Sequence, residues 1–264
     1  MLIVGERINA TRKRIGEAVL NQDAELIKAE AVKQVEAGAN LIDVNGGIPG
    51  RETEFLLWLV DVVQGVVDVP LCLDSADADA LEAALPRCNQ PPLVNSITFE
   101  KERLERVTPL IKEHDAKVIA LCMSDDGPPK SLEDRIEIAG RLVDHLTGDG
   151  LPLEKIYVDP CVFPISTGSE AGPFVLDAVG WIRSQYPGIH TICGASNVSF
   201  GLPVRKILNA TFLAMLIARG LDSAIIDPCN SLTRASVLAA EALAGHDDFC
   251  TNYIAAFRAG DLEV

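Results

Sequence analysis

A single (β/α)8 barrel, a TIM barrel of the α/β class spanning residues 1–264, is the fold that the sequence predicts. Short apolar runs typical of strands alternate with longer amphipathic stretches along the whole chain. Each repeat takes about 30 residues, which is the length of one β-then-α step. Eight such units fit the size of a closed barrel in which helices cover parallel strands. No linker or shift of composition divides the chain, so we expect one domain.

The elements can be placed in order from the apolar runs and the periodic stretches that follow them. We expect strands at residues 2–5, 41–44, 71–73, 93–94, 118–121, 156–158, 191–193 and 224–226. We expect helices at residues 24–37, 54–60, 78–85, 101–114, 132–146, 174–186, 206–218 and 234–244. Glycines at helix-to-strand connections, such as Gly38 and Gly220, are typical of helix ends. An open doubly wound sheet is the alternative, but no glycine-rich dinucleotide turn follows the first strand.

Composition excludes several classes of function. The formal net charge of −15 argues against nucleic acid or an anionic membrane as partner. No apolar run approaches the roughly 20 residues of a membrane span, and residues 1–7 lack the pattern of a signal peptide. We therefore expect a cytoplasmic protein. The seven cysteines include no C-x-x-C pair, which favours reduced thiols over a disulfide framework or a zinc site.

Polar residues follow the predicted strands, at the end of a barrel where sites are built. Most are Asp or Asn, and none is histidine. One such residue would indicate only a turn, which is the alternative for Asp43 and Asn45 beside two glycines and for Asp227 before a proline. Together they predict a polar floor that binds a ligand. The set is Glu6, Asn9, Asp43, Asn45, Asp74, Asn95, Asp159, Asn197 and Asp227.

This floor suits a neutral heterocycle better than a metal or a phosphate. About half of the set is amide rather than carboxylate, which argues against a divalent metal. Few basic residues lie near strand ends apart from Arg7 and Arg205, which argues against phosphate. A 2-amino-4-oxo ring offers an N–H beside an amino group, and the two oxygens of one carboxylate can accept both. Asn supplies the donor and acceptor for the remaining ring edge.

Asn197 lies in the glycine-flanked segment 193–201, Cys-Gly-Ala-Ser-Asn-Val-Ser-Phe-Gly. The segment follows an apolar run, and its glycines allow the backbone to approach a ligand closely. We therefore expect Asn197 on a loop just past a strand end. The alternative is that Asn197 only caps the next helix.

The strand-end segments resemble those of the pterin-binding methyltransferases, which act on methyltetrahydrofolate with a corrinoid protein. The matching segments run in order along nearly the whole chain. They are Leu-Ile-Val-Gly-Glu-Arg-Ile-Asn at 2–9, Leu-Cys-Leu-Asp-Ser at 71–75, Asn-Ser at 95–96, Tyr-Val-Asp-Pro at 157–160, Ser-Asn-Val-Ser at 196–199 and Thr-Phe-Leu-Ala-Met at 211–215. The resemblance implies a homodimeric TIM barrel that moves the N5 methyl group between methyltetrahydrofolate and the cobalt of a separate corrinoid protein.

The resemblance also implies which residues act. Asp74, Asn95 and Asp159 are expected to hold the pterin, and Asn197 is expected to contact N5 as the catalytic residue. Further candidates for the pterin site are Glu6, Asn9, Asp43, Ser96 and Arg205. Because no Asp-x-His-x-x-Gly motif for a cobalt ligand occurs, we expect the corrinoid (cobalamin) on the partner protein and no metal bound by this chain.

Three other functions share parts of this chemistry. Dihydropteroate synthases have the same fold, but the chain lacks their amino-terminal Asn-x-Thr-x-Asp-Ser-Phe pattern and their Ser-Arg-Lys segment. A non-catalytic pterin-binding module would present the same floor, and only a methyl-transfer assay separates it from an enzyme. A barrel lyase or aldolase would need an activated lysine or a metal, and few lysines lie near strand ends.

Overall fold

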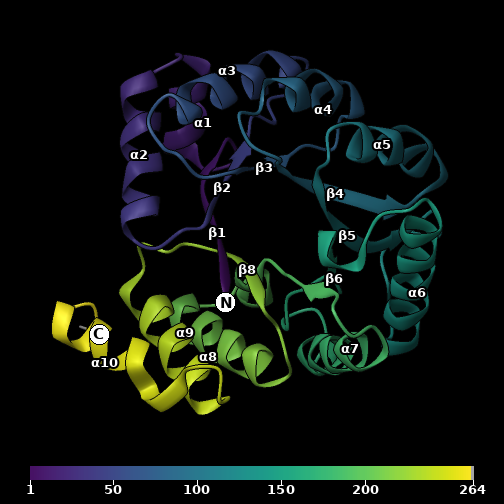
Figure 1. Ribbon diagram of the computed structural model, residues 1–264. Helices are drawn as coiled ribbons and strands as arrows, with labels where there is room; N and C mark the ends of the chain where they lie inside the picture. The colour runs from purple at the N-terminus through teal and green to yellow at the C-terminus, as the bar shows by residue number, and fades with distance from the viewer. Residues whose placement is uncertain (263–264) are drawn as a thin grey trace.

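The computed structural model describes residues 1–262 and arranges eight parallel strands as a barrel with helices outside it (Figure 1). The sheet order is β7-β6-β5-β4-β3-β2-β1-β8, so neighbours in the sequence are neighbours in the sheet. Between β7 and β8 the ring closes through a parallel bridge from Gly194 to Ile225. There the N–H of Ile225 donates to the carbonyl of Cys193 at 3.0 Å. The predicted barrel is confirmed, although β7 and β8 are joined by a single bridge and not by a longer ladder.

All eight predicted strands are present, but most of them extend past the apolar run. Their bounds are β1 Leu2–Asn9, β2 Leu41–Asn45, β3 Leu71–Asp74, β4 Leu93–Phe99, β5 Lys117–Ser124, β6 Ile156–Asp159, β7 His190–Thr191 and β8 Ser223–Ile226. Most of the polar residues that were expected just past the strands therefore lie within them, because backbone pairing continues beyond the apolar side chains. For example, Asp74 pairs in register with Asn95. The seventh strand is the exception, since it ends at Thr191 rather than Cys193.

The helices follow the predicted order, with two additions. They are α1 Lys13–Leu20, α2 Ala24–Glu36, α3 Glu52–Gln64, α4 Ala78–Ala84, α5 Lys101–Glu113, α6 Leu132–Gly148, α7 Ala171–Gln185, α8 Arg205–Ala218, α9 Ser231–Leu243 and α10 Thr251–Ala259. Short 3-10 helices are η1 Leu85–Arg87, η2 Leu153–Lys155, η3 Ala195–Ser199 and η4 Asp248–Cys250. The pattern did not predict α1, which is short, or α10, which contains no buried residue.

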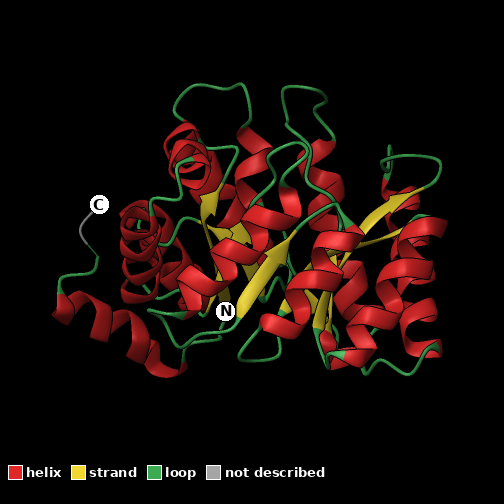
Figure 2. Cartoon of the chain, turned by 90° about the horizontal axis from the view of Figure 1, so that it is seen from above, coloured by secondary structure: helices red, strands yellow, loops and turns green. Residues whose placement is uncertain are grey.

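Apolar packing forms two layers. The larger layer lies between the strands and the surrounding helices, which form a ring in Figure 1 and lie along the outside of the upright strands in Figure 2. A smaller cluster fills the inside of the barrel, and it consists of Val4, Leu41, Cys72, Leu93, Ile119, Tyr157 and Ile192. Side chains on a strand alternate between faces, so a residue two positions further along points the same way. This interior cluster therefore supports the polar residues that follow two positions later on the same strands.

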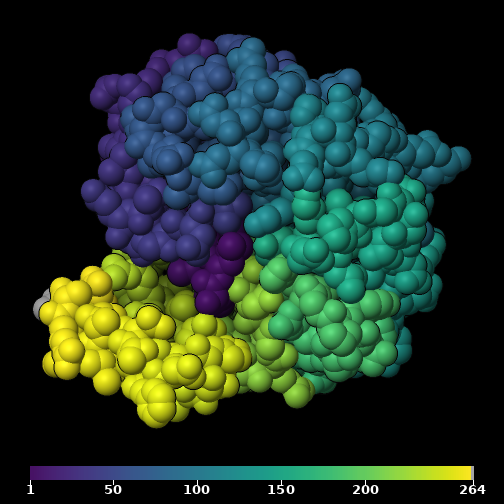
Figure 3. Space-filling view, in the orientation of Figure 1, coloured from purple at the N-terminus to yellow at the C-terminus, as the bar shows by residue number. Residues whose placement is uncertain are grey.

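The two ends of the barrel differ in what they present. Figure 3 shows the face at which the amino-terminal residues lie near the centre, so the carboxyl ends of the strands lie on the opposite side.

At helix ends, Gly38 and Gly220 have φ of 98° and 102°, a backbone conformation that favours glycine. Within residues 1–262, none of the helices has the length and apolar character needed to cross a bilayer.

Candidate active site

A cavity of about 440 Å³ opens at the carboxyl ends of the strands. Its lining brings together residues from β1, β2, β3, β4, β6 and η3, which are far apart in the sequence. Seven of the predicted site residues line it, namely Glu6, Asn9, Asp43, Asp74, Asn95, Asp159 and Asn197. The rule that barrel sites form at strand ends thus placed the main candidates in one cavity.

Four predicted residues do not line this cavity, namely Ser96, Arg205, Asn45 and Asp227. Ser96 turns its carbonyl toward α5, where Arg103 donates to it. Arg205, the first residue of α8, donates from Nη2 to the carbonyl of Ser196 at 2.7 Å and from Nε to the hydroxyl of Ser199 at 3.0 Å. It lines a neighbouring cavity of about 390 Å³ instead. Contact of Ser96 or Arg205 with the pterin stays a prediction.

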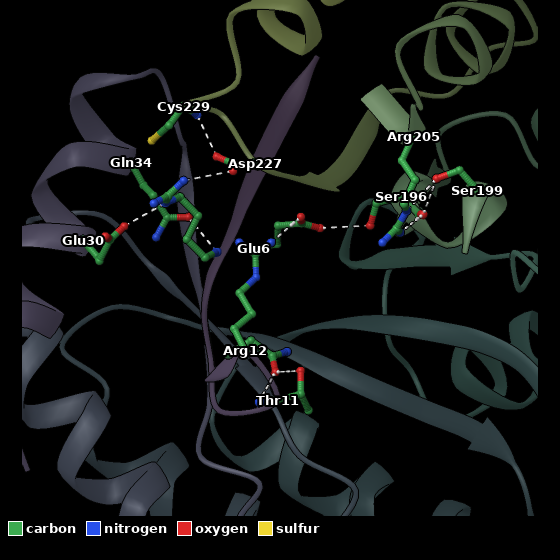
Figure 4. Close-up of polar contacts among 12 residues, drawn as sticks. Glu6, Thr11, Arg12, Glu30, Gln34, Ser196, Ser199, Arg205, Asp227 and Cys229 are labelled. Atoms are coloured by element: carbon green, nitrogen blue, oxygen red, sulfur yellow. Dashed lines mark hydrogen bonds and ion pairs between the residues drawn. The ribbon is translucent and has the colours of Figure 1, made fainter. Parts of the chain in front are cut away.

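Asn45 and Asp227 are bound within the chain rather than open to a ligand. The amide of Asn45 donates to Oδ2 of Asp74 at 2.9 Å, and its oxygen accepts from the N–H of Gly47 at 2.9 Å. Asp227 accepts from the N–H of Cys229 at 3.0 Å, as a turn residue does, and from Nη1 of Arg7 at 3.0 Å (Figure 4). The turn alternative is therefore correct for both residues, although Asn45 also orients Asp74.

Glu6 joins the first strand to η3 (Figure 4). One oxygen accepts from Nη2 of Arg12 at 2.6 Å, and the other accepts from the hydroxyl of Ser196 at 3.4 Å. Burial raises the pKa of Glu6, and the Arg12 charge opposes this rise. Arg7, by contrast, does not line the cavity, and its Nε donates to Glu30 at 2.7 Å. The cation beside the cavity is thus Arg12, which follows the true end of β1 and was not predicted.

Asp43 and Asp74 form a pair of neighbouring carboxyl groups on the cavity floor. Asp43 is 2% exposed, and burial followed by the charge of Asp74 raises its pKa well above the ordinary value. Burial also raises the pKa of Asp74, against the hydrogen bond from Asn45. Among residues 1–262, Oδ1 of Asp43 has no hydrogen-bond partner. A buried oxygen of this kind calls for a donor, which a ligand in the cavity can supply.

Asp159 ends β6 and is 9% exposed. The N–H of Cys161 donates to its Oδ1 at 2.8 Å. Burial raises the pKa of Asp159 to about 7, while this hydrogen bond and the charge of Arg135 oppose the rise. The carboxyl group therefore titrates near neutral pH, inside a cavity already rich in acidic groups.

Asn197 lies in the 3-10 helix η3 rather than on an open loop. Its N–H donates to the carbonyl of Gly194 at 3.1 Å, and its side chain reaches the cavity wall. A Cβ atom at Gly194 would stand 3.3 Å from Nδ2 of Asn197, closer than such contacts normally are. The helix-cap alternative is wrong, because α8 begins at Arg205 and is preceded by Val204 as its N-cap residue.

The arrangement fits a flat polar ring with several donors. Carboxyl groups at Asp43, Asp74 and Asp159 accept hydrogen bonds, while Asn95 and Asn197 can both donate and accept. The unpartnered oxygen of Asp43 adds a further polar group to the cavity floor. The sequence did not predict the other lining residues, because most of them lie in turns after the strands and Leu121 and Ile225 are apolar strand residues. The other lining residues are Thr11, Arg12, Leu121, Cys161, Val162, Gly194, Ser196 and Ile225.

Comparison with known proteins gives three results. The sequence matches the family of pterin binding enzymes over residues 5–227. It is 36% identical over 265 residues to a methylcorrinoid:tetrahydrofolate methyltransferase from Eubacterium limosum, covering 99% of this chain and 98% of that protein. It is also 31% identical over 240 residues to methionine synthase from Mycobacterium leprae, covering 86% of this chain but only 20% of that longer protein.

The fold resembles that of a solved Yersinia pestis dihydropteroate synthase with a pterine–sulfa conjugate. The TM-score is 0.72 at 16% sequence identity, and the match covers 92% of this chain and 94% of the other. At this identity the likeness concerns the fold alone.

Proposed function

The chain belongs to the family of pterin binding enzymes, and we propose that it transfers the N5 methyl group between methyltetrahydrofolate and the cobalt of a corrinoid on a separate protein. The observation that carries this proposal is the 36% identity with a methylcorrinoid:tetrahydrofolate methyltransferase over nearly the full length of both proteins. The methionine synthase match, over a fifth of that protein, also favours folate and methyl transfer. Dihydropteroate synthase shares only the fold at low identity.

The floor of the cavity would hold the pterin. Asp159, once ionised, can accept the ring N–H and the 2-amino group with its two oxygens. Asp74 at the end of β3 pairs in register with Asn95 in β4, and the two provide a second polar edge for the ring. Holding the ring in a fixed orientation brings N5 to a defined place and lowers the entropy cost of the transfer.

Asn197 is the proposed catalytic residue. The corrinoid on the partner protein supplies the cobalt that gives or accepts the methyl group. When methyltetrahydrofolate is the donor, the N5–methyl bond breaks and its electron pair stays on N5. Because N5 is already protonated and keeps this proton, the product is neutral tetrahydrofolate. Asn197 would accept a hydrogen bond from the protonated N5 and stabilise its charge as the bond breaks. An amide does not titrate near neutral pH, so Asn197 orients this proton without supplying it.

The assembly and location are part of the same proposal. We propose a homodimer, which exposed apolar side chains on α8 and α10, including Ile207, Met215 and Phe257, would support. Light scattering at working concentrations measures this directly. The seven cysteines are all free, which suits a reducing compartment such as the cytoplasm.

A spectroscopic assay tests the reaction. Methyltetrahydrofolate is added to the enzyme with free cob(I)alamin, and the loss of the cob(I)alamin absorbance is followed. We expect the loss to depend on both enzyme and folate. Enzyme that binds tetrahydrofolate but leaves the absorbance unchanged, with free cofactor and with candidate carrier proteins alike, would instead identify a pterin-binding module. Formation of dihydropteroate from a pterin diphosphate and p-aminobenzoate would identify the synthase.

A further inference from the structure

Arg103, in the first turn of α5, lies against the turn that follows β3 and against the middle of β4. Its Nε and Nη2 donate to the carbonyl of Ser96 at 2.9 and 2.6 Å. Nη2 also donates to the carbonyl of Ser75 at 2.8 Å, and Nη1 donates to the carbonyl of Ala76 at 2.8 Å. One guanidinium group therefore binds three backbone carbonyls that belong to two different segments, the turn after β3 and strand β4.

Two of these carbonyls belong to the residues that come directly after Asp74 and Asn95. The two segments are already joined on one side, because the N–H of Ser75 donates to the carbonyl of Asn95 at 3.1 Å. Arg103 binds them from the side of the helix layer. The backbone next to Asp74 and Asn95 is thus held by the hydrogen bond between the two segments and by the guanidinium group of Arg103.

We propose that Arg103 is a positioning residue, which sets where the Asp74 carboxyl group and the Asn95 amide stand in the pterin cavity. The inference rests on the proposed function, because it concerns how the cavity binds its folate substrate. Arg103 does not line the cavity, so any effect on the substrate passes through the turn after β3 and through β4.

The chemistry of the side chain explains why an arginine stands here. A guanidinium group offers five N–H donors in a fixed plane, and Arg103 uses three nitrogens on three carbonyls. A lysine ammonium group is a single nitrogen, and it cannot reach the same carbonyls with the same directions. Removal of the group would leave the part-buried carbonyls of Ser75 and Ser96 without this donor, and the backbone around them would shift to find water.

A matched control lies one turn further along the same helix. Arg106 pairs with Asp79 and lies 3.7 Å from Glu82, and these side chains are largely exposed. Arg106 is thus an arginine of α5 with ion pairs, but among the described residues it has no hydrogen bond to the turn after β3 or to the backbone of β4. Its replacement changes the charge and the helix surface in the same way while leaving the cavity residues alone.

The experiment compares Arg103→Met, Arg103→Lys and Arg106→Met by calorimetric titration with tetrahydrofolate. The binding stoichiometry counts folded sites, and the dissociation constant reports the geometry of each site. For Arg103→Met we expect a dissociation constant about 10- to 100-fold higher, since a displacement of about 1 Å at a site has effects of that order. Arg103→Lys should lie between this variant and the wild type, and Arg106→Met should stay within about twofold of the wild type.

Unchanged affinity per folded site in Arg103→Met, with only a lower thermal midpoint, would mean that Arg103 merely stabilises the fold and would overturn the inference. If Arg103→Met does not fold, Arg103→Lys decides, because it keeps the charge and most of the stem. Wild-type affinity in Arg103→Lys would then overturn the inference, and weaker affinity would support it. Wild-type protein that binds no tetrahydrofolate overturns the proposed function itself, and the role of Arg103 with it.

Discussion

The backbone N–H of Cys161 donates to Oδ1 of Asp159 at 2.8 Å, within the turn that ends β6. Cys161 has φ of 64°, a left-handed conformation that is uncommon for residues other than glycine. Its carbonyl accepts from Nη2 of Arg135 at 3.3 Å, and Arg135 is 1% exposed. The turn that holds the Asp159 carboxyl group is thus held in place by a hydrogen bond from the buried cation Arg135.

This relationship predicts how folate binding depends on pH. Burial raises the pKa of Asp159 to about 7, and the proposed contact with the pterin needs the ionised form. Affinity for tetrahydrofolate should therefore strengthen as the pH rises from about 6 to about 8. Asp159→Asn should weaken affinity about 10-fold or more at the higher pH and flatten the dependence, because an amide neither ionises nor accepts two donors. Calorimetric titration over this range measures both effects, and equal affinity at pH 8 would remove Asp159 from the pterin site.

Asn197→Ala should lower turnover more than binding. Loss of one preorganised hydrogen-bond partner at a developing charge lowers turnover by about 10²-fold or more. The ring would still be held by Asp74, Asn95 and Asp159, so the dissociation constant for methyltetrahydrofolate should change much less. Steady-state turnover and equilibrium binding, measured on the same preparation, separate the two. Binding that collapses while turnover per bound folate survives would make Asn197 a recognition residue only.

The sequence predicts the barrel and the main cavity residues because both follow local rules. Apolar runs mark strands, and the polar residue directly after a run, such as Asp74 after residues 71–73, is expected at the mouth of the barrel. Asp74, Asn95 and Asp159 could be found in this way without any knowledge of distant contacts.

The residues that the sequence misses depend on long-range geometry. Arg103 and Arg135 reach the cavity turns from helices, and nothing in their neighbourhood along the chain distinguishes them from surface arginines. Arg12 was missed because β1 continues to Asn9, beyond its first apolar run. The sequence could not show either that the side chain of Arg205 turns to the carbonyl of Ser196 and lines the neighbouring cavity.

Gly194→Ala offers an independent test of Asn197. The added methyl group would stand 3.3 Å from Nδ2 of Asn197, so the amide has to move away from its place at the cavity wall. We expect turnover to fall about 10-fold or more, in the same direction as Asn197→Ala, while folding is kept because φ of Gly194 is −77°.

A matched control for this substitution is Gly168→Ala, where a Cβ atom would meet nothing within 4 Å. Turnover of this variant should equal that of the wild type. The assay is the cob(I)alamin absorbance change, with a thermal melt to check folding. A Gly194→Ala enzyme with normal turnover would show that the position of the Asn197 amide is not critical.

At the opposite end of the barrel, Asp222 supports the fold rather than the site. Burial would raise its pKa, but hydrogen bonds from His190 at 2.8 Å and the N–H of Thr191 at 3.0 Å, with the Arg183 charge, lower it. A carboxyl group with a lowered folded pKa stabilises the fold above its unfolded pKa of about 3.9, and this contribution is lost as the pH falls through the folded value. Asp222→Asn should therefore lower the free energy of unfolding by about 1–3 kcal/mol at pH 7, with a difference that shrinks below about pH 4.

Urea titrations test this against Asp177→Asn, whose exposed pair with Arg219 should contribute less than about 1 kcal/mol. Equal losses in the two variants would show that the His190–Asp222 pair has no special role in stability.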